Sequence, residues 1–398
     1  MSLNDTPSSE RVHIGFFGRR NAGKSSVVNA VTGQELSVVS DVKGTTTDPV
    51  TKAMELLPLG PVVIIDTPGF DDEGELGELR VRKTKQILNR TDLAVLIVDG
   101  TVGLTDTERQ LIGIFTEKNI PYLTVYNKSD IAQKRICQDN ETEVSALTGE
   151  NIYELKERIA ALAKLPSAEK RIVGDLLSPC DMVVLVTPID AAAPKGRMIL
   201  PQVQTLRDVL DADAMAVFTK EHQLAETLGK LSAPPKMVIT DSQAFAMVSK
   251  TVPEDVPLTS FSILMARYKG FLETAIKGAA AISSLEDGAK VLISEGCTHH
   301  RQCGDIGTEK LPKWIRDFTG RQFNFSWTSG TEFPADLSPY RLIIHCGGCM
   351  LNEREMQYRY RCAADQNVPM TNYGLCIAYV HGILKRSLSV FPDLAEKV

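Results

Sequence analysis

A glycine-rich segment near the N-terminus carries the residue types that bind nucleotide phosphates. Residues 18–25 read GRRNAGKS, which matches G-x-x-x-x-G-K-S/T, and they directly follow the apolar run at 12–17. In this pattern backbone N–H groups surround the phosphates at the N-terminus of a helix. We expect Lys24 to reach the β- and γ-phosphates and the hydroxyl of Ser25 to bind Mg²⁺. A chance glycine-rich turn is the alternative, and the strand before the motif argues against it.

Two further segments follow in the order that a Mg²⁺–nucleotide site requires. Residues 66–69 (DTPG) end a second apolar run. There Asp66 can hold Mg²⁺ through water, and the Gly69 N–H can contact the γ-phosphate. The polar segment 44–48 (GTTTD) lies between these motifs. We expect Thr46, or a neighbouring threonine, to complete the Mg²⁺ coordination when a nucleoside triphosphate is bound, although alone this segment could be any solvated loop.

The base is selected by residues 127–130 (NKSD), which follow the apolar run at 121–126. The carboxylate of Asp130 can accept hydrogen bonds from both N1–H and the amino group of guanine, and adenine offers no such pair of donors. Lys128 can pack along the base, and the backbone at 145–146 can contact the guanine oxygen. The predicted nucleotide-binding residues are Gly18, Asn21, Ala22, Gly23, Lys24, Ser25, Ser26, Thr46, Asp66, Gly69, Asn127, Lys128, Asp130, Ser145 and Ala146, with Lys24, Asn21 and Thr46 as catalytic residues and Ser25 and Thr46 on Mg²⁺.

Cysteine and histidine gather in the last quarter of the chain, after two further apolar runs. Residues 297–299 (CTH) follow the run at 289–294, and residues 345–349 (HCGGC) follow the run at 340–344. Ligands of open α/β sheets collect beyond the carboxyl ends of the strands, so these two segments can converge. The predicted metal ligands are Cys297, Cys346 and Cys349, with His345, His299, Asp305 or Cys303 as a fourth.

Spacing alone leaves three chemistries open for this cluster. Three thiolates with a variable fourth ligand suit an iron–sulfur cluster, whereas three cysteines and one histidine suit structural zinc. The Cys-x-x-Cys pair could also be a redox dithiol. A zinc site is normally closed, and here additional histidine and cysteine side chains remain unassigned.

Strands that alternate with helical patterns predict an α/β fold with doubly wound, mostly parallel sheets. We place a nucleotide-binding domain at 1–166, a small α/β domain without ligand motifs at 167–258, and a third α/β domain at 259–398. The segment 260–283 is expected to form one long helix, bent near Gly270, and 374–388 another helix.

Composition excludes several classes of protein. The net charge of −6 gives no basic face for nucleic acid, and no apolar run reaches the length that spans a bilayer. The polar N-terminus lacks the apolar core of a signal peptide, so we expect a cytoplasmic protein whose cysteines are not in disulfides.

The nucleotide motifs resemble those of the Era and tRNA-modification branch of GTPases. That resemblance implies that Asn21 helps to bind K⁺, which can supply positive charge where other systems insert an arginine finger. Phe70 stands where Ras-like proteins place a water-orienting glutamine. Hydrolysis is therefore expected to be slow without K⁺.

The whole chain resembles the [FeFe]-hydrogenase maturation GTPases, the HydF family. The resemblance implies GTP/GDP and Mg²⁺ in the first domain, a homodimer through the middle domain, and a [4Fe–4S] cluster with a transient di-iron precursor in the third. Its partners would be immature [FeFe]-hydrogenase and two radical-SAM maturases, with neither nucleic acid nor membrane. The alternatives are an RNA-related, Era-like GTPase with a C-terminal zinc domain, and a redox enzyme with a regulatory GTPase domain.

Overall fold

The computed structural model describes residues 8–34, 50–67, 87–163, 170–188, 198–296, 305–330 and 332–396. The chain divides into two compact units, Met1–Ala168 and Glu169–Val398. The predictions for Thr46, Gly69, Phe70, Cys297, His299 and Cys303 lie outside the described residues.

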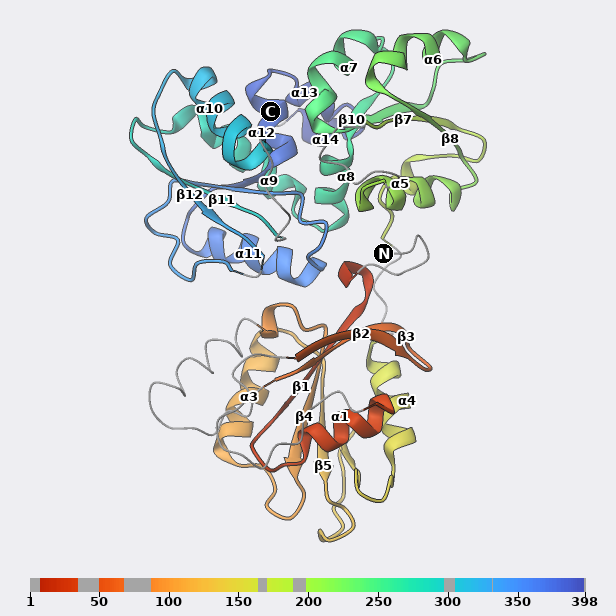
Figure 1. Cartoon of the computed structure of the whole chain (residues 1–398), viewed down its shortest axis with the longest axis vertical. Coiled ribbons are helices and arrows are strands. Elements are labelled where there is room, and N and C mark those ends of the chain that lie inside the picture. Colours follow the sequence, from red (N-terminus) through yellow and green to blue (C-terminus); the bar gives the residue numbers. More distant parts are fainter. Residues whose placement is uncertain are drawn as a thin grey trace. The chain divides into compact units, whose positions relative to one another are not determined.

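The first unit is built on one six-stranded sheet of order β2-β3-β1-β4-β5-β6 (Figure 1). Strand β2 pairs antiparallel with β3, and the other neighbouring strands pair in parallel. The strands are β1 (Val12–Gly18), β2 (Val50–Leu56), β3 (Gly60–Asp66), β4 (Leu93–Asp99), β5 (Tyr122–Asn127) and β6 (Glu141–Glu143).

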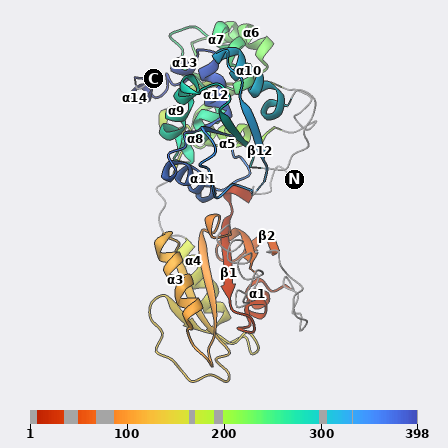
Figure 2. The same ribbon diagram turned by 90° about the vertical axis from the view of Figure 1, so that its left-hand side faces the viewer.

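Helices cover both faces of this sheet, which explains why its central strands β1 and β4 are almost wholly buried. Phe16 packs with α1 (Lys24–Thr32) and α4 (Ile152–Ala163) on one face. Its neighbour Phe17 packs with α3 (Asp106–Glu117) on the other. Figure 2 shows α3 and α1 on opposite sides of β1.

The second unit contains two all-parallel, four-stranded sheets, of order β10-β9-β7-β8 and β12-β11-β13-β14. Its strands are β7 (Met182–Val186), β8 (Met215–Thr219), β9 (Met237–Thr240), β10 (Leu258–Ser260), β11 (Lys290–Ser294), β12 (Asn324–Thr328), β13 (Leu342–His345) and β14 (Met370–Asn372). The helices are α5 (Leu200–Leu210), α6 (Leu224–Lys230), α7 (Phe245–Thr251), α8 (Phe261–Tyr268), α9 (Leu272–Ala280), α10 (Leu311–Thr319), α11 (Glu353–Asp365), α12 (Tyr373–Val380), α13 (Leu384–Ser387) and α14 (Pro392–Ala395).

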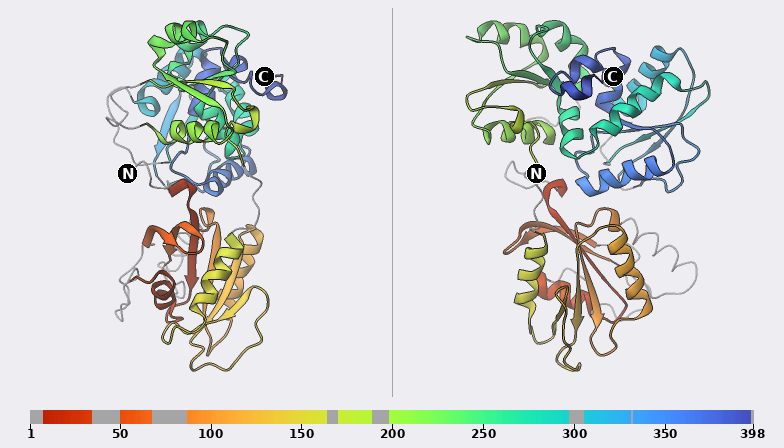
Figure 3. Two further views of the ribbon diagram at one scale, coloured as in Figure 1. Left: turned by 90° about the vertical axis from the view of Figure 1, so that its right-hand side faces the viewer. Right: turned by 180° about the vertical axis from the view of Figure 1, so that it is seen from behind.

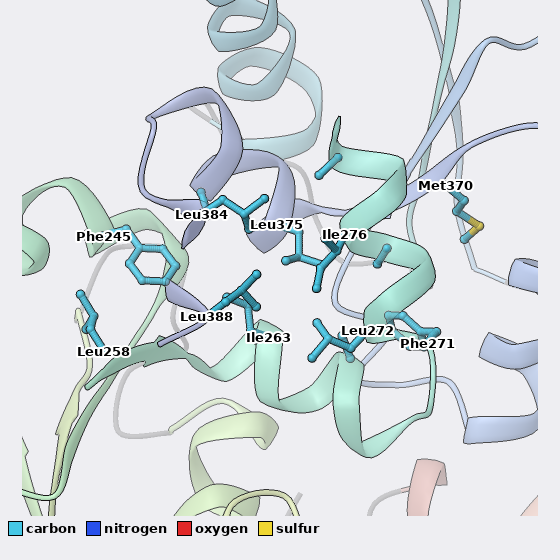
Figure 4. Close-up of a cluster of buried hydrophobic side chains, with 14 of the residues drawn as sticks. Phe245, Leu258, Ile263, Phe271, Leu272, Ile276, Met370, Leu375, Leu384 and Leu388 are labelled. Carbon is cyan, nitrogen blue, oxygen red and sulfur yellow. The ribbon is translucent and has the colours of Figure 1, made fainter. Parts of the chain in front are cut away.

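One apolar core joins the two sheets of this unit. It includes Val184 and Val238 of the first sheet, Leu292 and Ile343 of the second, and side chains of α8 and α9. Figure 4 shows Ile263 of α8 and Leu272 and Ile276 of α9 in this cluster. Around the second sheet, α11 packs on one face and α10 and α12 on the other (Figure 3). Burial of this shared surface supplies the driving force that keeps the sheets together.

The α/β class predicted from the sequence is confirmed, but two long helices are not. The segment 260–283 forms α8 and α9 rather than one helix, because Gly270 has a φ of 76° and ends the first. Likewise, 374–388 is divided at Gly382, whose φ is 71°. Glycine at such positions terminates helices since it adopts the left-handed conformation without strain. Among the described residues, none of the helices has the length and apolar character needed to cross a membrane.

Asp208 of α5 holds the beginning of the second unit in place. One carboxylate oxygen accepts hydrogen bonds from the backbone N–H groups of Ile172, Val173 and Gly174, at 2.9, 2.7 and 2.6 Å. The side chain of Asp208 is only 11% exposed. Three partly buried backbone N–H groups therefore depend on one carboxylate.

We expect Asp208→Ala to lower the free energy of unfolding of the second unit by about 2–4 kcal/mol. The three N–H groups would lose their charged acceptor but remain partly buried, where an unpaired donor is costly. Urea unfolding of the full chain would measure this change. Asp211→Ala is the matched control at the end of the same helix, since Asp211 is exposed and forms a surface ion pair with Arg207. Equal midpoints for the two variants would contradict the assignment.

Candidate functional site

The phosphate-binding segment turns between β1 and α1, as the sequence predicts. Asn21 and Gly23 have positive φ values of 63° and 84°, and the first helical hydrogen bond runs from the N–H of Val27 to the carbonyl of Gly23. Glycine at the helix N-cap brings no side chain to cap the first-turn N–H groups. These groups and the helix dipole are suited to phosphate oxygens.

Lys24 and Asp66, predicted to meet phosphate and Mg²⁺, lie together. The Lys24 ammonium forms an ion pair with the Asp66 carboxylate, and the two side chains are 10% and 11% exposed. Asp66 ends β3 opposite Phe16 of β1. The next residue, Thr67, donates its hydroxyl to the carbonyl of Phe16 at 2.7 Å and fixes the end of the strand.

Asn127 joins the phosphate side of the site to the base side. Its side-chain amide donates to the carbonyl of Ala22 at 3.0 Å and accepts from the N–H of Ala146 at 3.0 Å. The hydroxyl of Ser145 donates to Asp130 at 2.6 Å and orients that carboxylate. The structure thus brings three separate predicted motifs into one network.

Lys128 extends from the same loop toward the end of β4. It has a φ of 69°, and its ammonium donates to the Asp99 carboxylate. Burial would raise the pKa of Asp99, but hydrogen bonds from Lys128 and Thr101 outweigh burial and hold the pKa below its ordinary value. An ionised Asp99 therefore fixes the direction of the Lys128 side chain.

Gly23 is required at its position for two reasons. An alanine Cβ there would lie 2.1 Å from the Asn127 amide nitrogen, and the residue has a positive φ. We expect Gly23→Ala to weaken GTP binding by about ten- to a hundredfold, because the strained loop separates the phosphate and base motifs. Fluorescent GTP titration would measure the affinity.

Gly113→Ala is the control for this variant. Gly113 lies in α3, where an added Cβ meets nothing within 4 Å. The control should bind GTP as the unmodified chain does. Unchanged affinity in Gly23→Ala would refute the role given to the Gly23–Asn127 contact.

A second constellation lies at the carboxyl ends of β11 and β13. These strands pair with Ser294 opposite His345, and the N–H of Cys346 donates to the Ser294 carbonyl at 2.8 Å. The Cys346 sulfur accepts hydrogen bonds from the N–H groups of Gly296 and Gly348, at 3.0 and 3.4 Å. The two segments that carry the predicted ligands therefore adjoin.

Cys349 lies in the same loop beside a buried lysine. Burial raises the pKa of the Cys349 thiol, and the positive charge of Lys269 opposes part of that rise. The Lys269 ammonium donates to the carbonyls of Gly348 and Leu351, at 2.5 and 2.8 Å. The loop is thus held from within the protein as well as along the strand.

His345 is fully buried behind Cys346, with both ring nitrogens hydrogen-bonded. Nε2 accepts from the guanidinium of Arg359 at 3.0 Å, because arginine can only donate. Nδ1 therefore carries the proton and donates to the Cys346 carbonyl at 2.8 Å. Burial and the charge of Arg359 lower the pKa of His345 to about 3, so the ring is neutral.

Arg359 is itself completely buried, on α11, and several groups hold it. It donates to the Glu355 carboxylate at 2.8 Å, to the Gly330 carbonyl at 3.0 Å and to Ser294 at 3.4 Å. Sequence reasoning missed both Arg359 and Lys269, because neither belongs to a motif. Only the fold shows that they lie next to the cysteine loop.

Asp305, the other described candidate for a fourth ligand, begins the helical turn Ile306–Lys310. One carboxylate oxygen accepts from the N–H and hydroxyl of Thr308, at 2.9 and 3.0 Å. Within the described ranges, no three His, Cys, Asp or Glu side chains gather as a metal site. The predicted set includes Cys297, which lies outside those ranges, so the ligand assignment stays a prediction.

Comparison with protein families divides the chain into three successive matches. Residues 13–128 match the model described as a 50S ribosome-binding GTPase. Residues 172–270 match the hydrogen maturase F dimerization domain, and residues 273–390 match the hydrogen maturase F tetramerization domain. The two maturase models together account for more than half of the chain.

Individual relatives resemble only part of the chain. The tRNA modification GTPase MnmE of Nitrosomonas europaea is 33% identical over 172 residues, which are 42% of this chain and 37% of the relative. GTPase Der of Wolinella succinogenes is 33% identical over 175 residues, or 39% of this chain and 36% of the relative. The chain therefore spans less than half the length of these two relatives.

Among solved structures, the crystal structure of Aquifex aeolicus Era bound to GDP and AlF4⁻ is 19% identical to this chain. The matched region covers 60% of this chain and 99% of the Era chain, with a TM-score of 0.35. A structural likeness of that size carries no functional argument.

Proposed function

Because this chain belongs to the hydrogen maturase F family, we propose that it is a GTPase that assembles or delivers the di-iron subcluster of the [FeFe]-hydrogenase active site. The order of the three family matches carries this proposal: a GTPase domain is followed by both maturase domains. Immature [FeFe]-hydrogenase and the radical-SAM maturases would be its partners in the cytoplasm. An RNA-related GTPase with a zinc domain has less support, because MnmE and Der resemble less than half of the chain.

In the nucleotide site, the positions of the described residues Lys24, Asp66 and Asn21 support the roles proposed for them. Lys24 would compensate phosphate charge, while Ser25 and Asp66 would hold Mg²⁺ directly and through water. The side chain of Asn21 is exposed at the turn, where it would help to bind K⁺. K⁺ would then supply positive charge where charge develops during GTP hydrolysis.

We expect GTP hydrolysis to be slow and faster in K⁺ than in Na⁺. Asn21→Gly should abolish the difference between the salts, because glycine keeps the left-handed backbone but removes the amide oxygen. Phosphate release in matched K⁺ and Na⁺ buffers measures the effect, with Arg20→Gly as a control in the same exposed turn. Equal rates of the unmodified chain in both salts would remove the cation argument.

In the second site, the described residues fit an iron–sulfur cluster. Cys346 and Cys349 offer two sulfurs from one loop, and N–H···S hydrogen bonds already surround Cys346. Cys297 would complete the set, and the cluster's fourth iron would offer an exchangeable position. Both nitrogens of His345 are occupied, which favours a role in positioning Cys346 over one as a ligand. His299 and Asp305 remain the proposed fourth ligands.

The match to a dimerization model also agrees with an exposed edge of the sheet β10-β9-β7-β8 in the second unit. Its outer strand β8 exposes Met215 and Phe218, which are 46% and 36% exposed. An apolar edge strand is a ready template for pairing with another chain. We propose that a second copy covers this edge in a homodimer.

We expect Cys346→Ser to lose the cluster and the activation of immature hydrogenase but to keep GTP hydrolysis, since the two sites lie in separate units. Iron content after anaerobic reconstitution, hydrogen evolution and phosphate release measure these three properties. Cys180→Ser is the control, because Cys180 is exposed and belongs to no predicted site. Full iron content in Cys346→Ser would show that the ligand assignment is wrong.

A further inference from the structure

Lys269 is a buried cation that no motif explains. It follows α8 directly and is only 3% exposed. Its ammonium donates to the carbonyls of Gly348 and Leu351, which lie on either side of Cys349 in the sequence. Burying an ammonium is costly unless its surroundings compensate the charge, so such a residue needs a reason.

The neighbours of Lys269 contact two separate parts of the second unit. Arg267 donates to Asp175, which lies just before β7, at 2.9 Å. On the other side, Phe271 stacks on Tyr360 of α11, with ring centroids 4.3 Å apart. The segment from 267 to 271 therefore joins the residues matched by the dimerization model to the loop that carries Cys346 and Cys349.

We propose that Lys269 is a positioning residue that fixes the loop at 346–351 and supplies positive charge to an anionic thiolate–metal centre held there. The inference rests on the proposed iron–sulfur function for its second half only. The two carbonyl contacts restrain the loop by themselves. The charge would favour the more negative, reduced form of a cluster and thereby raise its reduction potential.

Three substitutions separate these contributions in the full-length chain. Lys269→Met removes both charge and donors, Lys269→Gln keeps an amide donor, and Lys269→Arg keeps the charge. Lys277→Met is the control, because Lys277 is an exposed lysine on α9. Circular dichroism and thermal unfolding would establish which variants are folded.

Hydrogen exchange of the amides at 346–351 measures how firmly the loop is held. Redox titration after reconstitution with ferrous iron and sulfide measures the effect of the charge on the reduction potential. We expect Lys269→Met to exchange at least about tenfold faster in this loop and to have a lower potential. Lys269→Gln should lower the potential with less effect on exchange, and Lys269→Arg should retain the potential. The control should change neither property.

Unchanged exchange and unchanged potential in a folded Lys269→Met would overturn the inference. If that variant does not fold, Lys269→Gln and Lys269→Arg decide: equal potentials in these two would reject the role of charge. If the unmodified chain takes up no iron, the proposed cluster function fails instead. The exchange comparison would then still decide whether Lys269 restrains the loop.

Discussion

Parallel pairing of buried strands is the constraint on which both sites depend. Since parallel strands start together and end together, their following loops gather at one edge of the sheet. In the first unit this pairing brings Asp66 beside the loop that follows β1. In the second unit it brings Cys346 beside Ser294 and Gly296, about fifty residues earlier. The core that buries these strands is therefore what makes distant motifs neighbours.

The sequence predicted the α/β architecture and the turn between β1 and α1 because their signals are local. An apolar strand followed by a glycine-rich turn and a helix needs no distant partner to be recognised, and β1, its loop and α1 follow that pattern. The strands β2, β6, β10 and β14 were missed. Three residues carry too little periodicity in β6, β10 and β14, and β2 is exposed along most of its length. The continuous helix predicted across Gly270 was wrong. Apolar residues on both sides of Gly270 gave an uninterrupted helical pattern, but the chain turns at Gly270, next to Lys269, which contacts the cysteine loop.

The surroundings of the cysteines could not be predicted, because they depend on tertiary burial. His345 stands beside Cys346 in the sequence, but Arg359 and Lys269 belong to no motif. The structure buries all three near Cys346 and Cys349, and it makes His345 neutral through burial and the charge of Arg359. A histidine beside a cysteine reads in sequence as a ligand. Here both its nitrogens are bonded to protein groups, which favours a role in holding the backbone of Cys346 in place.

Buried charged groups of both signs lie around the cysteine loop. Glu295 is 2% exposed and accepts from the hydroxyl of Tyr373 at 3.1 Å. Burial, followed by the charge of Glu295, raises the pKa of Tyr373, which keeps this phenol protonated and able to donate. A carboxylate, thiolates and a metal centre would accumulate negative charge in a low dielectric, where such charge is costly. The buried ammonium of Lys269, which contacts the loop, would oppose that accumulation, whereas Arg359 is already paired with the Glu355 carboxylate. The buried ammonium of Lys269 therefore lies where it would lower the cost of an anionic group on this loop, because it contacts the carbonyls of Gly348 and Leu351 on either side of Cys349.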